Sequence, residues 1–176
     1  MYFRRAPRRD SLADLPGIET RRLRIAALAP EDAAALRAVT DDPAITGAVD
    51  FLPDPFTLED ARGLIGSGRH GNDRFLGAWS RDERRLVAVL GTHLRGETAI
   101  EIGYWVAGAA RGQGVGAEAV TGIVGLLLRR FPGRLIVAEC RLGNVASWGL
   151  LRKLGFRETG EDGHRPGRRV LVLERG

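Results

Sequence analysis

Apolar and polar residues alternate with two different periods along this chain, and the period changes at turn residues. Short runs rich in β-branched and aromatic residues, bounded by polar or glycine-containing turns, predict strands. Apolar residues that recur every three or four positions predict helices. The sequence therefore predicts strands at 23–28, 75–80, 86–94, 99–106, 135–138, 156–159 and 170–173. It predicts helices that begin near residues 30, 57, 116 and 144.

The strands at 75–80, 86–94 and 99–106 follow one another directly, with only short polar turns between them. Such turns favour antiparallel pairing, because parallel strands need a longer crossover connection. Helices are predicted both before and after this meander. We therefore expect an α+β fold, in which a mixed, mostly antiparallel central sheet is flanked by helices.

Composition sets the scale of the molecule. With 176 residues, of which 44% are hydrophobic and 28% charged, the chain is long enough for one domain with a sizeable core. We expect a flexible basic leader at 1–17 and a single domain at 18–176. A basic arm that touches RNA is the alternative for the leader. We interpret the formal net charge of +5 as a solvated surface, so a nucleic-acid partner is not expected.

Cysteine and histidine usage restricts the chemistry. Cys140 is the single cysteine, so an internal disulfide is excluded, and its position inside a strand predicts a small core residue. The three histidines are scattered and give no metal-ligand spacing, so we expect no metal site. The N-terminus lacks the apolar core of a signal peptide, and no run approaches the roughly 20 apolar residues of a membrane span. We expect a soluble, cytoplasmic protein.

A glycine-rich segment, Arg111–Ala117, lies between a predicted strand and a predicted helix. Its glycines let the backbone turn sharply and expose N–H groups at the positive end of the helix, which predicts a phosphate-binding site. Gly112, Gly114 and Ala117 match a dinucleotide fingerprint, with Glu139 near the position of a ribose-binding acid. However, an antiparallel meander precedes the loop, and too few elements follow it for a dinucleotide-binding fold.

A second pattern starts at Arg111, in which Arg-x-x-Gly-x-Gly spans Arg111, Gly114 and Gly116. Some thirty residues later come Asn144-Val145-Ala146-Ser147 and Leu151-Arg152-Lys153-Leu154-Gly155-Phe156. In these motifs the chain resembles the GNAT superfamily of acyl-CoA-dependent N-acyltransferases. It is most similar to the branch named for the ribosomal-protein N-terminal alanine acetyltransferases. The strong resemblance covers roughly residues 99–157.

The resemblance implies acetyl-CoA as cosubstrate, with its pyrophosphate over 111–117 and its pantetheine arm along Trp105 and Val106. A basic residue is usual in the family where Gln113 stands, so one phosphate contact is expected to rest on backbone N–H groups. The cofactor-binding residues carried over are Trp105, Val106, Arg111, Gly112, Gln113, Gly114, Val115, Gly116, Ala117, Asn144 and Ser147.

The reaction implied is direct attack of a primary amine on the thioester. Glu101 is the candidate general base, because it interrupts an apolar strand where an unpaired buried carboxylate would be costly. A structural glutamate paired with an arginine is the alternative, and His93 is a reserve base. Ser147 is the candidate that protonates the thiolate. Tyr104 is a substitute for it, although strand alternation puts Tyr104 on the opposite face from Glu101.

The acceptor has the weakest signature in the sequence. The resemblance puts it beside the proline-bearing loop 41–56, where we expect Phe51, Leu52 and Phe56 to be exposed, and beside the loop 160–169. Anchoring of these loops in the core is the alternative. The sequence leaves open whether the acceptor is a protein N-terminus, a lysine or a small amine, and it leaves the oligomeric state open, a homodimer included. A non-catalytic acyl-CoA-binding module is the alternative to an enzyme.

Overall fold

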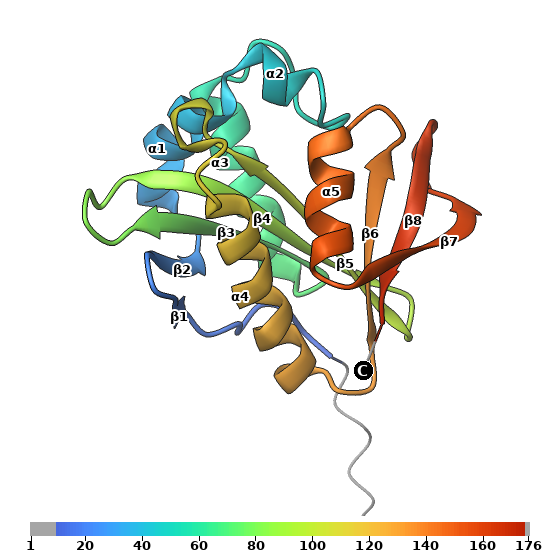
Figure 1. Ribbon diagram of the computed structural model, residues 1–176. Helices are drawn as coiled ribbons and strands as arrows, with labels where there is room; N and C mark the ends of the chain where they lie inside the picture. Colours follow the sequence, from blue (N-terminus) through green and yellow to red (C-terminus); the bar gives the residue numbers. More distant parts are fainter. Residues whose placement is uncertain (1–9, 175–176) are drawn as a thin grey trace, which may run out of the picture.

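Within residues 10–174, which the computed structural model describes, eight strands form one sheet in the order β1-β2-β3-β4-β5-β6-β8-β7 (Figure 1). Neighbouring strands pair antiparallel except β5 and β6, which pair parallel. The expected fold class, a mixed and mostly antiparallel sheet flanked by helices, is confirmed. The strands are β1 Ile18–Glu19, β2 Leu23–Ala27, β3 Asp73–Ser80, β4 Leu86–Arg95, β5 Ala99–Val106, β6 Leu135–Arg141, β7 Phe156–Asp162 and β8 Arg168–Leu173.

Helices cover both faces of the sheet, because strand alternation gives each face its own apolar residues (Figure 1). One core cluster lies under the last two α-helices and includes Ile100 and Ile102 of β5. The other lies under the first and third and includes Trp105 of the same strand. The α-helices are α1 Ala33–Thr40, α2 Pro43–Thr46, α3 Leu58–Ser67, α4 Val115–Arg130 and α5 Val145–Lys153, and 3₁₀ turns cover Pro30–Asp32, Gly68–His70 and Gly108–Ala110.

Local sequence signals fix several helix ends. Thr57 and Asp60 form a reciprocal capping box at the start of α3. The hydrogen bonds from Thr57 hold the pKa of Asp60 below its usual range. Asn144 caps α5 by accepting a hydrogen bond from the backbone N–H of Ser147 at 3.1 Å. Gly155 follows that helix with a φ of +91°, a conformation that favours glycine.

Three features differ from the sequence-based expectations. The short strand β1 and the four-residue helix α2 were not predicted. Leu52 and Phe56 were expected to be exposed but are buried between α1 and α3, because this loop fills the core on that face of the sheet. Phe51 keeps 45% of its surface exposed and lies against Phe75 and Trp105.

The expected flexible leader also differs from the structure, as far as it is described. Leu12 and Leu15 are buried in the core under α4, and the Asp10 carboxylate pairs with Nε of Arg134 at 2.7 Å. Leu12 and Leu15 therefore anchor the segment 10–17 to the core, while residues 1–9 lie outside the described part. Every helix within residues 10–174 falls short of the length and apolarity needed to traverse a bilayer.

Candidate active site

A gap opens between β5 and β6, the two parallel strands. In the described structure their pairing ends at Ile102 and Ala138, yet β5 continues to Val106 and β6 to Arg141. A cavity of about 800 Å³ lies at this gap, within the range of small-molecule sites, about 300–1,000 Å³. Because the strands separate, residues from both faces of β5 line the same cavity. The gap therefore joins the two sides of the sheet.

The glycine loop forms one end of the cavity. Gly112 and Gly114 have φ values of +73° and +76°, which a residue with a Cβ adopts at a cost. The N–H of Glu118 donates to the carbonyl of Gly114, so the amides before it at the start of α4 lack intrahelical acceptors. Gly116 lets the loop pack closely, since a Cβ there would lie 3.2 Å from Val106 and from Leu150. This cradle fits the pyrophosphate of coenzyme A.

The polar side chains of the loop point to protein groups. Nη2 of Arg111 pairs with Asp42 at the start of α2 at 2.9 Å, and Nε donates to the carbonyl of Val106. The amide of Gln113 donates to the carbonyl of Ala109 at 2.8 Å. Both side chains therefore shape the loop. Within the described residues, the groups of this loop that stay free of protein partners are the backbone N–H groups at the start of α4.

Sequence reasoning missed a cation beside the loop, Arg22. Its Nη1 donates to the carbonyl of Gln113 at 2.8 Å, and its Nε pairs with Glu118 at 2.6 Å. Burial raises the pKa of Glu118, but the hydrogen bonds from Thr20 and Arg22 outweigh burial, so the pKa lies below its usual range. Because Arg22 is 91 positions from Gln113 in the chain, no local motif contains this contact.

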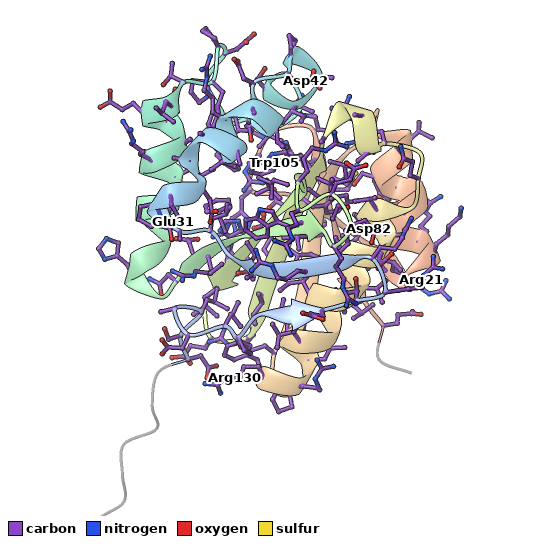
Figure 2. All side chains as sticks on the ribbon, turned by 90° about the vertical axis from the view of Figure 1, so that its left-hand side faces the viewer. Arg21, Glu31, Asp42, Asp82, Trp105 and Arg130 are labelled. Carbon is purple, nitrogen blue, oxygen red and sulfur yellow. The ribbon has the colours of Figure 1, made fainter. Side chains whose placement is uncertain are left out.

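The other predicted cofactor residues line the same cavity, namely Trp105, Val106, Val115, Ala117, Asn144 and Ser147. The indole of Trp105, however, is buried on the α1 side, where Nε1 donates to the Thr40 hydroxyl at 3.0 Å. Figure 2 shows Trp105 in the interior and Asp42 at the end of the molecule that carries α2. The indole of Trp105 is therefore part of the core on the α1 side of the sheet.

Two hydroxyl groups meet on the α5 side of the gap. The hydroxyls of Tyr104 and Ser147 lie 2.8 Å apart, and both residues line the cavity. Burial raises the pKa of Tyr104 to about 12, against the lowering effect of the Ser147 hydrogen bond. Tyr104 is thus a neutral donor at neutral pH. Cys140 lies in the cavity wall and in the core as a buried thiol, and burial raises its pKa.

Glu101 lies on the opposite face of β5, as alternation predicted, and lines the cavity with 3% of its surface exposed. Nε of Arg95 contacts its carboxylate at 2.6 Å, and Nη2 of Arg165 contacts it at 3.3 Å. Glu101 therefore pairs with arginines, as the structural alternative predicted, and it also lines the cavity. The reserve base His93 bonds Asp73 at 2.6 Å and is not among the described residues that line the cavity.

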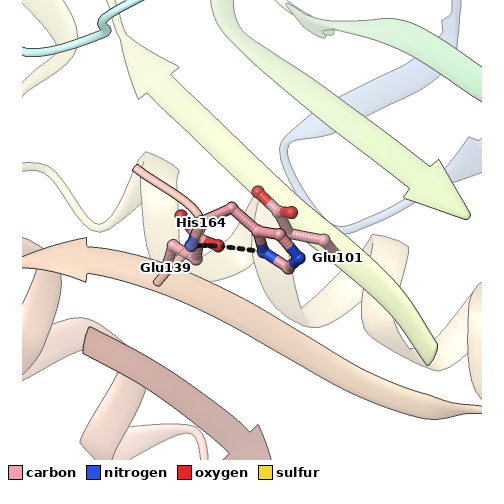
Figure 3. A group of neighbouring side chains, drawn as sticks. All are labelled: Glu101, Glu139 and His164. Atoms are coloured by element: carbon pink, nitrogen blue, oxygen red, sulfur yellow. Dashed lines mark hydrogen bonds and ion pairs between the residues drawn. The ribbon is translucent and has the colours of Figure 1, made fainter. Parts of the chain in front are cut away.

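A second carboxylate, Glu139 on β6, lies beside Glu101 (Figure 3). Its Oε1 accepts hydrogen bonds from the backbone N–H of His164 at 2.7 Å and involves Nδ1 of the same residue at 2.8 Å. Burial raises the pKa of Glu139, but these bonds and the charge of Arg165 outweigh burial, and the pKa lies below its usual range. Glu139 is therefore part of a charged cluster. The dinucleotide interpretation, in which Glu139 would bind a ribose, is contradicted by the antiparallel β3-β4-β5 meander.

Part of the cavity wall comes from α2 and the residues just after it. Ala44 and Ile45 of α2 line the cavity, as do Ala48 and Val49 just after it. Arg165, in the loop before β8, and Arg168, the first residue of β8, also line it. Arg141 and Arg168 hold this segment in place, because both guanidinium groups pair with Asp50. Residues just before Phe51 thus form this part of the cavity wall, whereas Leu52 and Phe56, the expected acceptor contacts, are buried in the core.

Comparison with known proteins identifies the class. Residues 22–157 match the model of the acetyltransferase (GNAT) domain, so the chain belongs to this family. It is an acetyl-CoA-dependent N-acetyltransferase. The uncharacterized N-acetyltransferase YnaD of Bacillus subtilis (strain 168) is 26% identical over 145 residues, which cover 81% of this chain and 84% of YnaD.

Solved structures share the fold. A GNAT-family acetyltransferase from Bacillus anthracis superimposes with a TM-score of 0.78 at 21% identity, over 90% of this chain and 98% of that one. RimL, a ribosomal L7/L12 α-N-protein acetyltransferase solved in complex with coenzyme A, gives a TM-score of 0.78 at 20% identity, over 89% and 97% of the two chains. The family and the fold expected from the motifs are therefore confirmed.

Proposed function

We propose that this enzyme transfers the acetyl group of acetyl-CoA to a primary amine, at a protein N-terminus or on a small molecule, by direct attack. The observation that carries the proposal is the cavity at the gap between β5 and β6. Both the glycine loop and Glu101 line this one cavity. An amine and a thioester can meet in the gap, because β5 and β6 are not hydrogen-bonded to each other there.

On the cofactor side, we infer that backbone groups do most of the binding. The N–H groups at the start of α4 hold the pyrophosphate, and the unpaired part of β5 near Val106 offers backbone groups to the pantetheine arm. Acetyl-CoA supplies the activated acetyl group. A backbone N–H near Val106 polarises the thioester carbonyl in this scheme.

On the acceptor side, Glu101 acts as the general base. An α-amino group has a pKa near 8, so one carboxylate, directly or through water, assists its deprotonation at neutral pH. Arg95 and Arg165 orient that carboxylate through their contacts at 2.6 and 3.3 Å. The aliphatic residues of α2, such as Ile45, cover the group that carries the amine.

Ser147 donates the proton to the leaving thiolate, and Tyr104 supports it. The Tyr104 hydroxyl lies 2.8 Å from the Ser147 oxygen, so it can replace the proton that Ser147 gives up, and the second proton that the newly acetylated nitrogen loses restores the pair. Asn144 fixes the first turn of α5 by its bond to the Ser147 N–H. A base and an acid thus stand on opposite faces of β5, with the gap between them.

Thiol release from acetyl-CoA, measured against a panel of peptides and small amines, tests the proposal. Activity with peptides that begin with Ala or Ser, and none with small amines, supports a protein N-terminus as acceptor. Activity with small amines alone assigns a small-molecule acceptor. Tight acetyl-CoA binding with no thiol release for any amine contradicts the proposal and leaves a non-catalytic acyl-CoA-binding module.

A further inference from the structure

Each transfer to an amine in its ammonium form releases one proton. A nitrogen–carbon bond forms, the carbon–sulfur bond breaks, the sulfur keeps one proton as the thiol, and one proton remains for the solvent. In the proposed function, on which this inference rests, Glu101 takes up that proton. The proton must then reach bulk water before the next turnover.

Glu101 has no direct way to give its proton to bulk water. It is 3% exposed, and each of its carboxylate oxygens contacts one guanidinium group, that of Arg95 or that of Arg165. The cavity that it faces is the space that the acceptor and the thioester occupy during turnover. A group that contacts both the surroundings of Glu101 and the solvent is therefore needed.

We infer that His164, held by Glu139, is the exit for this proton. One carboxylate oxygen of Glu101, one of Glu139 and one ring nitrogen of His164 all lie within 4.8 Å of one another (Figure 3). The His164 side chain is 78% exposed. Imidazole is the side chain whose ordinary charge change falls nearest neutral pH, so it can both accept and release a proton there. His164 thus spans the distance between a buried base and the solvent.

Glu139 is the positioning residue of this path. Its Oε1 accepts from the backbone N–H of His164 and contacts Nδ1, which fixes the imidazole beside Glu101. Its Oε2 is buried and accepts no hydrogen bond from the described residues, although Arg165 lies 3.6 Å away. A proton from Glu101, passed through one water, reaches Oε2 or the ring, and the ring passes it to the solvent.

The surrounding charges favour this path over a metal ion at the same three groups. Arg95 approaches from β4, Arg165 from the loop before β8, and Arg168 from β8 itself, where Nη1 donates to the carbonyl of Glu139. A dication at the cluster would face these guanidinium groups at close range. A mobile proton adds no lasting charge to the cluster.

Replacement of His164 by alanine tests the proton exit. In a dilute, bulky buffer we expect kcat for thiol release to fall on the order of tenfold, since a positioned proton-transfer group contributes at least that much. The KM for acetyl-CoA should stay unchanged. Added imidazole should restore kcat in proportion to its concentration. The matched control is His70→Ala, an exposed histidine on the far turn after α3, which should keep wild-type kcat and show no imidazole response.

Two outcomes overturn the inference. His164→Ala with wild-type kcat in dilute buffer shows that the proton leaves by another route. A reduced kcat that imidazole does not raise shows that His164 has a structural role only. Glu101→Gln separates this inference from the proposed function. A wild-type rate in Glu101→Gln contradicts the role of Glu101 as general base, and with it the proposed function. An inactive Glu101→Gln together with a wild-type rate in His164→Ala contradicts only the proton exit.

Discussion

The two ends of the cavity are built in different ways. The cofactor end uses backbone groups, in a loop with two glycines at positive φ and a helix N-terminus. The acceptor end uses side-chain charge pairs, in which Glu101, Glu139 and Asp50 contact arginines from β4, β6, β8 and the loop before β8. A backbone cradle recognises a phosphate that is the same in every turnover. A side-chain surface can change with its acceptor while the sheet stays the same.

The cofactor end should be the less tolerant of the two to backbone change. At Gly114, where φ is +76°, valine would be strained. We expect Gly114→Val to weaken coenzyme A binding by about 100-fold, which corresponds to about 2.7 kcal/mol. Isothermal titration with coenzyme A measures this effect. Gly133→Val is the matched control, since Gly133 has an ordinary φ and open space around its Cβ position. Equal binding by both variants would refute the backbone cradle.

Where the two ends meet, the hydroxyls of Tyr104 and Ser147 should affect kcat. Tyr104→Phe removes the partner of Ser147 but keeps the ring in the wall, so we expect kcat to fall about tenfold, or 1.4 kcal/mol in the barrier. The KM for acetyl-CoA should change little. Steady-state thiol release measures both constants. If Ser147→Ala and the double variant show the same kcat as Tyr104→Phe, the two hydroxyls act as one unit, whereas purely additive losses would contradict their coupling.

The raised pKa of Tyr104 should also appear in stability. Unfolded tyrosine ionises near pH 10, whereas burial keeps Tyr104 protonated until about pH 12. Its favourable contribution is therefore fully present below pH 10 and is lost as the pH rises towards 12. A shift of two units corresponds to about 2.7 kcal/mol. Denaturant unfolding should show that the free energy of unfolding falls less between pH 9 and pH 11.5 in Tyr104→Phe than in the wild type. Parallel losses would contradict the assignment.

Arg22 should give the smallest effect. Its guanidinium holds the carbonyl of Gln113 and pairs with Glu118 at a partly exposed site. We expect Arg22→Gln to weaken coenzyme A binding a few-fold, by about 1 kcal/mol or less, because solvent screens the charge. The exposed neighbour Arg21 serves as the control in Arg21→Gln (Figure 2). Titrations at low and high salt should show that the coenzyme A affinities of the two variants converge as the salt concentration rises. A difference in affinity that does not depend on salt would argue against a charge effect.

The contrast between the two ends also explains what sequence reasoning could predict. The glycine loop, the Asn144 cap and the meander depend on neighbours along the chain, so their patterns indicated the fold and the cofactor. Arg22 and Gln113 are 91 positions apart, and Arg168 and Asp50 are 118 apart. Contacts of that separation leave no local pattern. The burial of Leu52 and Phe56 was missed for the same reason, since their core cluster combines residues of α1, α3 and the strands β3, β4 and β5.

Glu101 illustrates the limit at a single residue. The interrupted apolar strand indicated a special environment, and alternation correctly separated Glu101 from Tyr104. No local pattern indicates that the pairing of β5 and β6 ends at Ile102, although this separation lets both residues line one cavity. The two competing interpretations of Glu101 are compatible in the structure, because the carboxylate pairs with Arg95 and Arg165 and also lines the cavity.

The central claim is that the two ends of the cavity are separate sites that meet at the gap. Glu101→Gln tests it most directly, with acetyl-CoA binding by titration and thiol release measured on the same preparation. Glu97→Gln, an exposed glutamate in the turn before β5, is the control. The account predicts wild-type acetyl-CoA affinity and a loss of kcat of about 100-fold or more in Glu101→Gln. Wild-type turnover, or lost turnover together with lost acetyl-CoA binding, would contradict it.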